Sequence, residues 1–225
     1  ANSLCPGGKI PLAYITDARY LPHDMDAIKQ AIMQQGAIYT MMYFVTHPDS
    51  LYYNASSFTY YYSGSHDVNH AVDLVGWDDN KATAGGEGAW ICRNSYGAGW
   101  GDNGYFYVSY NDTRILDYNA YWPARMDYEP EAQVYGYDEL GNWSSTGYGG
   151  HSGFMLVKFT ASRNQLISKV ATYAMAAGTT IGIDIYDHFD PVTGQLSVQR
   201  AHQPGLPCEL PGYYTFNLDK PVAVA

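Results

Sequence analysis

Residues 69–77 read NHAVDLVGW, and residues 88–106 read GAWICRNSYGAGWGDNGYF. The apolar run that opens at His70 and the run that ends at Asn94 are typical of β-strands, and the segment between them has turn composition. Four glycines punctuate the loop that follows, and a third strand is predicted at 105–110. The sequence therefore indicates a strand-loop-strand meander with a histidine at the start of one strand and an asparagine at the end of the next.

This pattern resembles that of the papain-like (C1A-type) cysteine peptidases. Members of that family typically read H-A-V-x-x-V-G-[YW] and then W-x-x-[KR]-N-S-W-G-x-x-W-G-x-x-G-Y-[FIY]. A lone histidine is more often a structural residue, and the apolar residues and glycines of the motif suit strands and turns with or without catalysis. Asn94 and the glycine loop follow His70 in the family's order, and this combination makes the resemblance specific.

The resemblance implies an acyl-transfer site with a thiol nucleophile. Such a thiol must be ionised, and a neighbouring imidazolium holds the thiolate near neutral pH. His70 is the expected general base and acid, and Asn94 is expected to orient the ring because its amide oxygen does so without adding charge. Tyr96 stands where the family usually has a tryptophan, and Trp100 matches the family's second tryptophan. Both aromatic residues are expected to shield the site from water.

The same resemblance implies a polypeptide substrate. Val68, Asn69 and Ala71 are expected to flank the substrate cleft, with Val68 and Ala71 as candidates for lining an apolar pocket. The chemistry requires no cofactor. The three cysteines lie far apart without CxxC spacing, so no metal site is expected.

No cysteine of the chain fits the family's nucleophile, which opens a long helix after an oxyanion-hole glutamine. A proline and two glycines follow Cys5 and argue against a helix that begins at this thiol. Cys92 lies in a predicted strand on the side of Asn94 and is expected to be a buried, apolar-like thiol, and Cys208 belongs to the second domain. We therefore expect the cysteine-bearing half to precede this chain, which would be a fragment that is inactive alone.

One helix is predicted before the meander, at 26–35, with Asp24 as its N-cap and Gly36 after its last turn. An apolar run with β character follows at 37–45. The fold class predicted for residues 1–122 is α+β: the His/Asn-bearing, antiparallel β-barrel half of a papain-like domain with one preceding helix.

A domain boundary is expected within 119–131, where Pro123 and Pro130 interrupt any regular pattern. Residues 123–225 are predicted to form an all-β, jelly-roll-like sandwich that is incomplete at its C-terminus, and they resemble the lectin-like domain of some prokaryotic papain-like peptidases. The strand-like runs lie at 153–159, 166–173, 180–186 and 213–218. Three aromatic residues could stack on a glycan or cell-wall sugar, although such residues are more often core: Tyr137, Trp143 and Tyr148.

Composition excludes several classes of partner. Twelve Lys and Arg against 22 Asp and Glu give a net charge of −10, and no basic run occurs, so neither nucleic acid nor an anionic membrane is an expected partner. No apolar stretch approaches the roughly 20 residues that span a bilayer. The 23 tyrosines and 23 glycines favour a β-rich protein. We expect an extracellular or cell-surface location.

The function predicted on these grounds is hydrolysis of peptide bonds by a cysteine-type endopeptidase with a Cys-His-Asn site. The alternative is a catalytically inactive peptidase homologue that acts as a carbohydrate- or protein-binding surface module.

Overall fold

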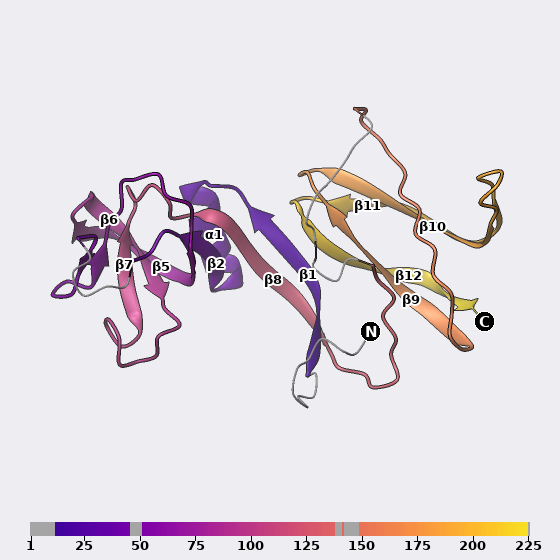
Figure 1. Ribbon diagram of the computed structural model, residues 1–225, viewed down its shortest axis with the longest axis horizontal. Helices are drawn as coiled ribbons and strands as arrows, with labels where there is room; N and C mark the ends of the chain where they lie inside the picture. Colours follow the sequence, from indigo (N-terminus) through magenta and orange to yellow (C-terminus); the bar gives the residue numbers. More distant parts are fainter. Residues whose placement is uncertain (1–11, 46–50, 138–140, 142–148, 225) are drawn as a thin grey trace. The chain divides into compact units, whose positions relative to one another are not determined.

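The computed structural model describes residues 12–45, 51–137, 141 and 149–224. The chain divides into two compact units (Figure 1). Arg19–Pro123 form the central unit, and the two ends of the chain, Ala1–Ala18 and Ala124–Ala225, form the flanking unit. The chain passes from one unit to the other within β1 (Ala13–Leu21) and again within β8 (Asp117–Asp127), and each unit has its own core.

The central unit is an antiparallel sheet with one helix. Its elements, besides β1 and β8, are α1 (Met25–Gln35), β2 (Ile38–Met42), β3 (Tyr53–Asn54), β4 (Thr59–Tyr60), β5 (His70–Thr83), β6 (Gly86–Arg93) and β7 (Tyr105–Ser109). In the sheet, the strands follow the order β3-β4-β7-β6-β5-β2-β8, and the pairs are antiparallel except for β4 with β7. The helix packs against β2 and β5.

Local signals explain where α1 begins and ends. The Asp24 side chain accepts a 2.8 Å hydrogen bond from the Ala27 amide, which satisfies one of the unpaired N–H groups of the first turn. Gly36, at φ 90°, ends the helix in a conformation that favours glycine. The helix turns its apolar stripe, Ile28, Ala31 and Ile32, into the core. The predicted helix and both of its caps are confirmed.

The core of the central unit follows from strand alternation. Val72 and Leu74 of β5 are buried, while Ala71 before them and Asp73 between them are exposed. The largest fully buried side chain is Trp90 of β6 among the residues the structure describes, and the fully buried side chains around it include Tyr60, Phe106, Ile28, Ile38 and Met42. Burial of this many large side chains fixes the register of the strands, because a slip by one residue would turn each apolar side chain to the opposite face.

The flanking unit is built from strands in two layers. In one layer β9 (Gln165–Ala174) pairs with β12 (Gly212–Val224), which lies next to β1; in the other β10 (Thr179–Phe189) pairs with β11 (Leu196–Cys208). Side chains of both layers share one core, for example Ile183 of β10 with Leu218 and Val222 of β12. The predicted fold class, one helix with a sheet followed by an all-β part, is confirmed.

Two expectations about strands were wrong, and one strand was missed. The run 153–159 is not a strand, and its Phe154 and Met155 side chains are exposed. The strand β11 was not expected, because its prolines and its weak alternation hide a strand that exists through pairing with β10. Pro123 does not interrupt the chain's extended course but lies inside β8, beyond Asp117 and Ala120, the two residues that pair with β2, so its missing N–H breaks neither of those pairs.

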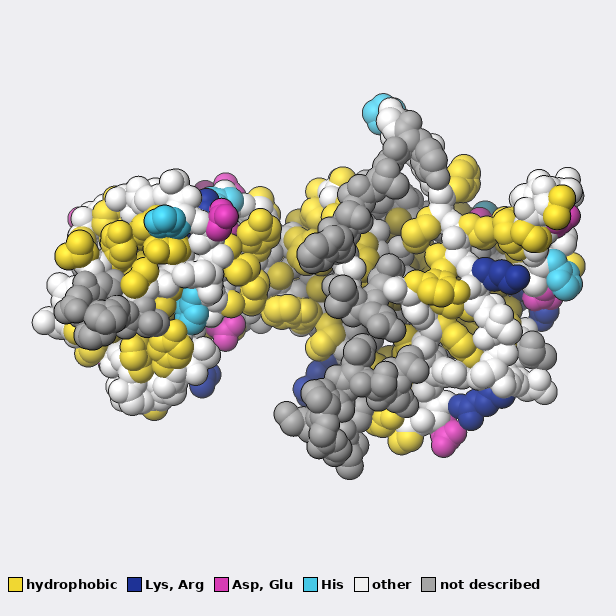
Figure 2. Space-filling view, viewed as in Figure 1, with side chains coloured by type: hydrophobic (Ala, Val, Ile, Leu, Met, Phe, Trp, Pro, Cys, Tyr) yellow, Lys and Arg dark blue, Asp and Glu magenta, His cyan; other side chains and the backbone are white. Residues whose placement is uncertain are grey.

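The described part of the chain carries neither a membrane-spanning helix nor a metal-binding cluster. No helix in it has the length and apolar character to cross a membrane. No cluster in it of three or more His, Cys, Asp or Glu side chains could hold a metal ion. Figure 2 shows Lys and Arg side chains scattered over the visible face rather than gathered into one patch.

Candidate active site

The centre of the candidate site is a contact between His70 and Asn94. His70 is the first residue of β5, and Asn94 follows the last residue of β6. The two strands pair antiparallel, with Leu74 opposite Cys92, so the ladder brings the two polar side chains to the same end of the sheet. The Nε2 atom of His70 and the Oδ1 atom of Asn94 are 3.0 Å apart. The predicted pair is therefore brought together.

Backbone contacts hold Asn94 rigidly in its place. Its side chain is 6% exposed, and its Oδ1 also accepts a 2.8 Å hydrogen bond from the Ser95 amide. Its own amide donates to the Gly104 carbonyl at 2.9 Å, which closes the base of the loop 95–104. In the tautomer protonated at Nε2, the His70 ring donates to Oδ1, and Nδ1 is then the ring nitrogen that can accept a proton.

Aromatic rings surround the imidazole. The Phe44 ring stacks on His70 with centroids 4.9 Å apart and planes 22° apart, and the Tyr96 ring lies 5.5 Å from the imidazole. Trp100 packs edge-on against Tyr96 at 5.5 Å and against Phe44 at 6.0 Å, so it supports these two rings. Phe44 was missed by the sequence reasoning, because it belongs to an apolar run in which nothing marks one aromatic residue from its neighbours.

The loop that carries Tyr96 and Trp100 depends on glycine at one position in particular. Gly101 has φ 61°, and a Cβ atom there would lie 2.4 Å from the Tyr105 carbonyl oxygen. Gly99 has no neighbouring atom within 4 Å of such a Cβ. The first glycine is therefore required by a close backbone approach, whereas the second is not.

The three residues expected at the cleft lie in different surroundings. Asn69 forms two hydrogen bonds with the backbone of Phe44: Oδ1 accepts from the amide at 2.7 Å, and Nδ2 donates to the carbonyl at 3.1 Å. This side chain thereby fixes the residue whose ring stacks on His70. Val68 is half-buried in the preceding loop, and Ala71 is exposed on the face of β5 opposite to His70.

The cysteines lie away from the imidazole or outside the described residues. Cys92 is a fully buried thiol on the same face of β6 as Asn94, and burial raises its pKa well above the ordinary value for cysteine. Cys208 is fully buried in the core of the flanking unit. Cys5 lies outside the described residues, as do Trp143 and Tyr148. The Tyr137 ring stacks on Phe159 at 5.0 Å within the flanking unit.

Comparisons with known proteins agree on two regions. The family model for papain family cysteine proteases matches residues 6–122, which is more than half of the chain. A model for a lectin-like domain matches residues 134–225. Among curated proteins, the cathepsin B-like CP2 of Giardia intestinalis is 33% identical over 100 residues, and the cathepsin B-like CP3 of the same organism is 34% identical over 116 residues.

Solved structures resemble the fold over nearly all of the chain. The clostridial cysteine protease Cwp84 after propeptide cleavage matches 94% of this chain with a TM-score of 0.65 and 21% identity. The cysteine protease and lectin-like domains of Cwp84, a surface layer associated protein of Clostridium difficile, match 94% of it with a TM-score of 0.63 and 20% identity.

The matches cover only part of each relative. The chain spans 31% and 36% of the two Giardia proteins, and 54% and 48% of the two clostridial chains. The matched segments make up 44% and 48% of this chain for the Giardia proteins. The chain belongs to the papain family of cysteine proteases, and a lectin-like domain follows the part that carries His70 and Asn94.

Proposed function

We propose that this chain supplies the histidine and asparagine of a papain-like cysteine endopeptidase whose nucleophilic cysteine lies on a part of the peptidase domain outside this chain. The observation that carries the proposal is the 3.0 Å contact between His70 Nε2 and Asn94 Oδ1. Phe44 and Tyr96 beside the imidazole support it, because they limit the access of water to that hydrogen bond. Trp100 supports it as the packing partner of both rings.

The reaction would be acyl transfer in two steps. The thiolate attacks the peptide carbonyl carbon, and as the C–N bond breaks, protonated His70 gives the Nδ1 proton to the leaving amine. A water molecule then attacks the thioester while Nδ1 of His70 takes one of its protons. The C–S bond breaks, the carboxylic acid product is released, and the thiolate–imidazolium pair is restored. Asn94 holds Nε2–H throughout, so that the proton moves only through Nδ1.

The described cysteines are poor nucleophiles in this proposal. The Cys92 thiol is inaccessible, and burial raises its pKa, which disfavours the thiolate. Cys208 lies in the core of the flanking unit. We therefore propose that the chain alone is inactive and that its partner is the cysteine-bearing half of the domain, with Val68 and Ala71 near the polypeptide substrate.

The test is the variant His70→Ala in the complete protein, assayed on a denatured protein substrate. We expect turnover to fall to background while the unfolding transition is unchanged, because His70 is half-buried and opens its strand rather than filling the core. His188→Ala, which removes an exposed histidine of β10, serves as the matched control and should retain activity. Substantial activity in His70→Ala would sink the assignment. The intact mass of the native protein should exceed 25.0 kDa.

We also propose an extracellular or cell-surface location. The support is that Cwp84, which shares the fold of both regions, is a surface layer associated protein. Digestion of intact source cells with added trypsin tests this location. A surface protein is digested, whereas a cytoplasmic marker survives.

A second candidate function is a binding module without catalysis. The match of residues 134–225 to a lectin-like domain favours it, because such a domain can act by recognition alone. A glycan array decides between the two: binding of a glycan by the complete protein, together with no hydrolysis of denatured protein, favours the module. Hydrolysis that depends on His70 favours the peptidase.

A further inference from the structure

The loop that leads into His70 has no strand pairing of its own. Residues 61–69 are neither helix nor strand, and the side chains of residues 63–67 are exposed. The imidazole comes directly after this loop. The end of the loop is tied to β2 and to Phe44, because the Asn69 amide donates to the Met42 carbonyl and its side chain bonds the Phe44 backbone. The earlier part of the loop contacts a turn some fifty residues further on, at Asp112–Arg114.

This turn pairs with both peptide groups of Tyr62. The Tyr62 amide donates to Asp112 Oδ2 at 2.8 Å, and the Tyr62 carbonyl accepts from the Thr113 amide at 2.9 Å. The Thr113 hydroxyl reaches further along the loop and donates to the Gly64 carbonyl at 2.7 Å. The loop backbone is thus held at two residues by two consecutive residues of the turn.

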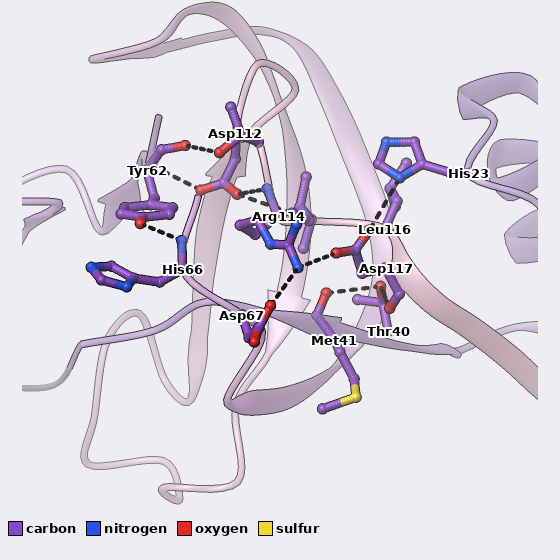
Figure 3. A network of polar contacts seen from close by, with 12 residues as sticks. His23, Thr40, Met41, Tyr62, His66, Asp67, Asp112, Arg114, Leu116 and Asp117 are labelled. Carbon is purple, nitrogen blue, oxygen red and sulfur yellow. Dashed lines mark hydrogen bonds and ion pairs between the residues drawn. The ribbon is translucent and has the colours of Figure 1, made fainter. Parts of the chain in front are cut away.

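Asp112 can hold the loop because it is itself fixed. It is 5% exposed, and its Oδ1 accepts from the amides of Arg114 at 2.9 Å and Ile115 at 3.0 Å, as in the close view of Figure 3. One carboxylate oxygen therefore closes the turn and the other binds the loop. A buried carboxylate with hydrogen bonds on both oxygens is held more firmly than an exposed one.

Arg114 adds a weaker contact nearer to the histidine. Its Nη2 lies 3.1 Å from Asp117 Oδ2 and 3.9 Å from Oδ1 of Asp67, three residues before His70 (Figure 3). Asp117 Oδ1 also lies 3.5 Å from Nδ1 of His23, a residue just before α1. The Asp67 side chain is fully exposed, so this ion pair adds little compared with the backbone contacts.

We propose that Asp112, Thr113 and Arg114 form a clamp that positions His70 against Asn94. We name these three residues the 112–114 clamp. The clamp fixes residues 62–67, so that the short remainder of the loop delivers the imidazole onto the Phe44 ring and into hydrogen-bond reach of Asn94 Oδ1. The catalytic use of this position rests on the proposed function, but the positioning itself does not.

The experiment compares Thr113→Val with Thr113→Ser and Thr83→Val in the chain as it exists. Valine keeps the shape of threonine and removes only the hydroxyl, whereas serine keeps the hydroxyl. Thr83 is the matched control because its hydroxyl also donates to a glycine carbonyl at 2.7 Å, at the far end of β5. The readouts are amide hydrogen exchange of residues 62–69 and the ¹⁵N chemical shifts of the His70 ring, which report its tautomer and its hydrogen bond.

For Thr113→Val we expect exchange in residues 62–69 to rise about fivefold, as the loss of about one net hydrogen bond implies, together with changed His70 ring shifts. Thr113→Ser should restore both, and Thr83→Val should change neither. Unchanged ring shifts in Thr113→Val, or equal changes in Thr83→Val, would overturn the proposal. A Thr113→Val chain that fails to fold is replaced by Thr113→Ala, which also removes the hydroxyl that donates to the Gly64 carbonyl and must move the ring shifts if the clamp acts. None of these readouts needs peptidase activity, so failure of the clamp and failure of the proposed function are distinguishable.

Discussion

Asp112 is a buried acidic residue of the central unit, and its ionisation affects the stability of the folded state. Burial raises its pKa to about 6, although the hydrogen bonds from Arg114, Tyr62 and Ile115 act in the opposite direction. A raised pKa means that the folded state binds the proton more tightly than the unfolded chain does. Asp112 therefore makes the folded state less stable as the pH rises from about 4 to about 6.

The prediction concerns the variant Asp112→Asn. Relative to this variant, the wild-type chain should lose up to about 3 kcal/mol of unfolding free energy between pH 4 and pH 7, because only the wild type carries the buried charge. Urea unfolding followed by the fluorescence of Trp77, Trp90 and Trp100 measures the difference. A flat difference for Asp112→Asn would contradict the burial argument.

Single residues differ in how far the sequence predicts them. His70 and Asn94 could be predicted as a pair, because their order and the glycine loop form a specific motif. The contact of Asn69 with Phe44 could not, since it joins residues 25 apart through a loop whose conformation the sequence does not reveal. The 112–114 clamp was missed for the same reason, with about fifty residues between the partners.

At the scale of elements, the backbone geometry of the loop 95–104 supports the packing of Tyr96 and Trp100, and a substitution at Gly101 tests this. Gly101→Ala should destabilise the central unit by about 1–3 kcal/mol, because the new Cβ would meet the Tyr105 carbonyl at 2.4 Å and alanine is disfavoured at φ 61°. Urea unfolding gives the free energy, and near-ultraviolet circular dichroism follows the packing of Trp100 against Tyr96.

Gly99→Ala is the matched control for that prediction. It is the same chemical change two residues away, with open space around the added methyl group. Its unfolding free energy should stay within about 0.5 kcal/mol of the wild type. Equal destabilisation by both substitutions would mean that the close approach at Gly101 is not what the loop requires.

Elements with strong local signals could be predicted, and those set by distant partners could not. The helix α1 carries its own caps and apolar stripe, so its limits follow from the sequence. The strand β11 contains Pro204, Gly205 and Pro207 and takes its form from pairing with β10. The run 153–159 has strand composition, yet composition alone does not provide a partner for its backbone.

For the whole molecule, charge gives the clearest prediction. A net charge of −10 without a basic patch on the face in Figure 2 should keep the chain from heparin at pH 7, and solubility should be lowest near the isoelectric point of about 4.9. Chromatography on heparin and on an anion exchanger, with a turbidity series across pH, measures both. Salt-dependent retention on heparin at pH 7 would contradict the expectation that polyanions are not partners.

The chain changes from one unit to the other inside two strands, β1 and β8. The two domains predicted from the sequence, 1–122 and 123–225, remain a prediction. The change of unit at Pro123 lies inside β8, so this proline does not mark a break in the chain's extended course. The strand β1 lies beside β12, about two hundred residues later in the chain, and no local pattern indicates this pairing.

The antiparallel pairing of β5 with β6 also limits where codons can be inserted into the gene or deleted from it. His70 and Leu74 share a face of β5 because side chains alternate, and Leu74 is held opposite Cys92, two residues before Asn94. Loss of one in-frame codon between His70 and Leu74 would turn the imidazole to the other face of the sheet. Codons added at the hairpin tip, between Thr83 and Gly86, would lengthen only the turn. Insertions and deletions among related genes should therefore concentrate at that tip, and the spacing on either side of it should stay constant.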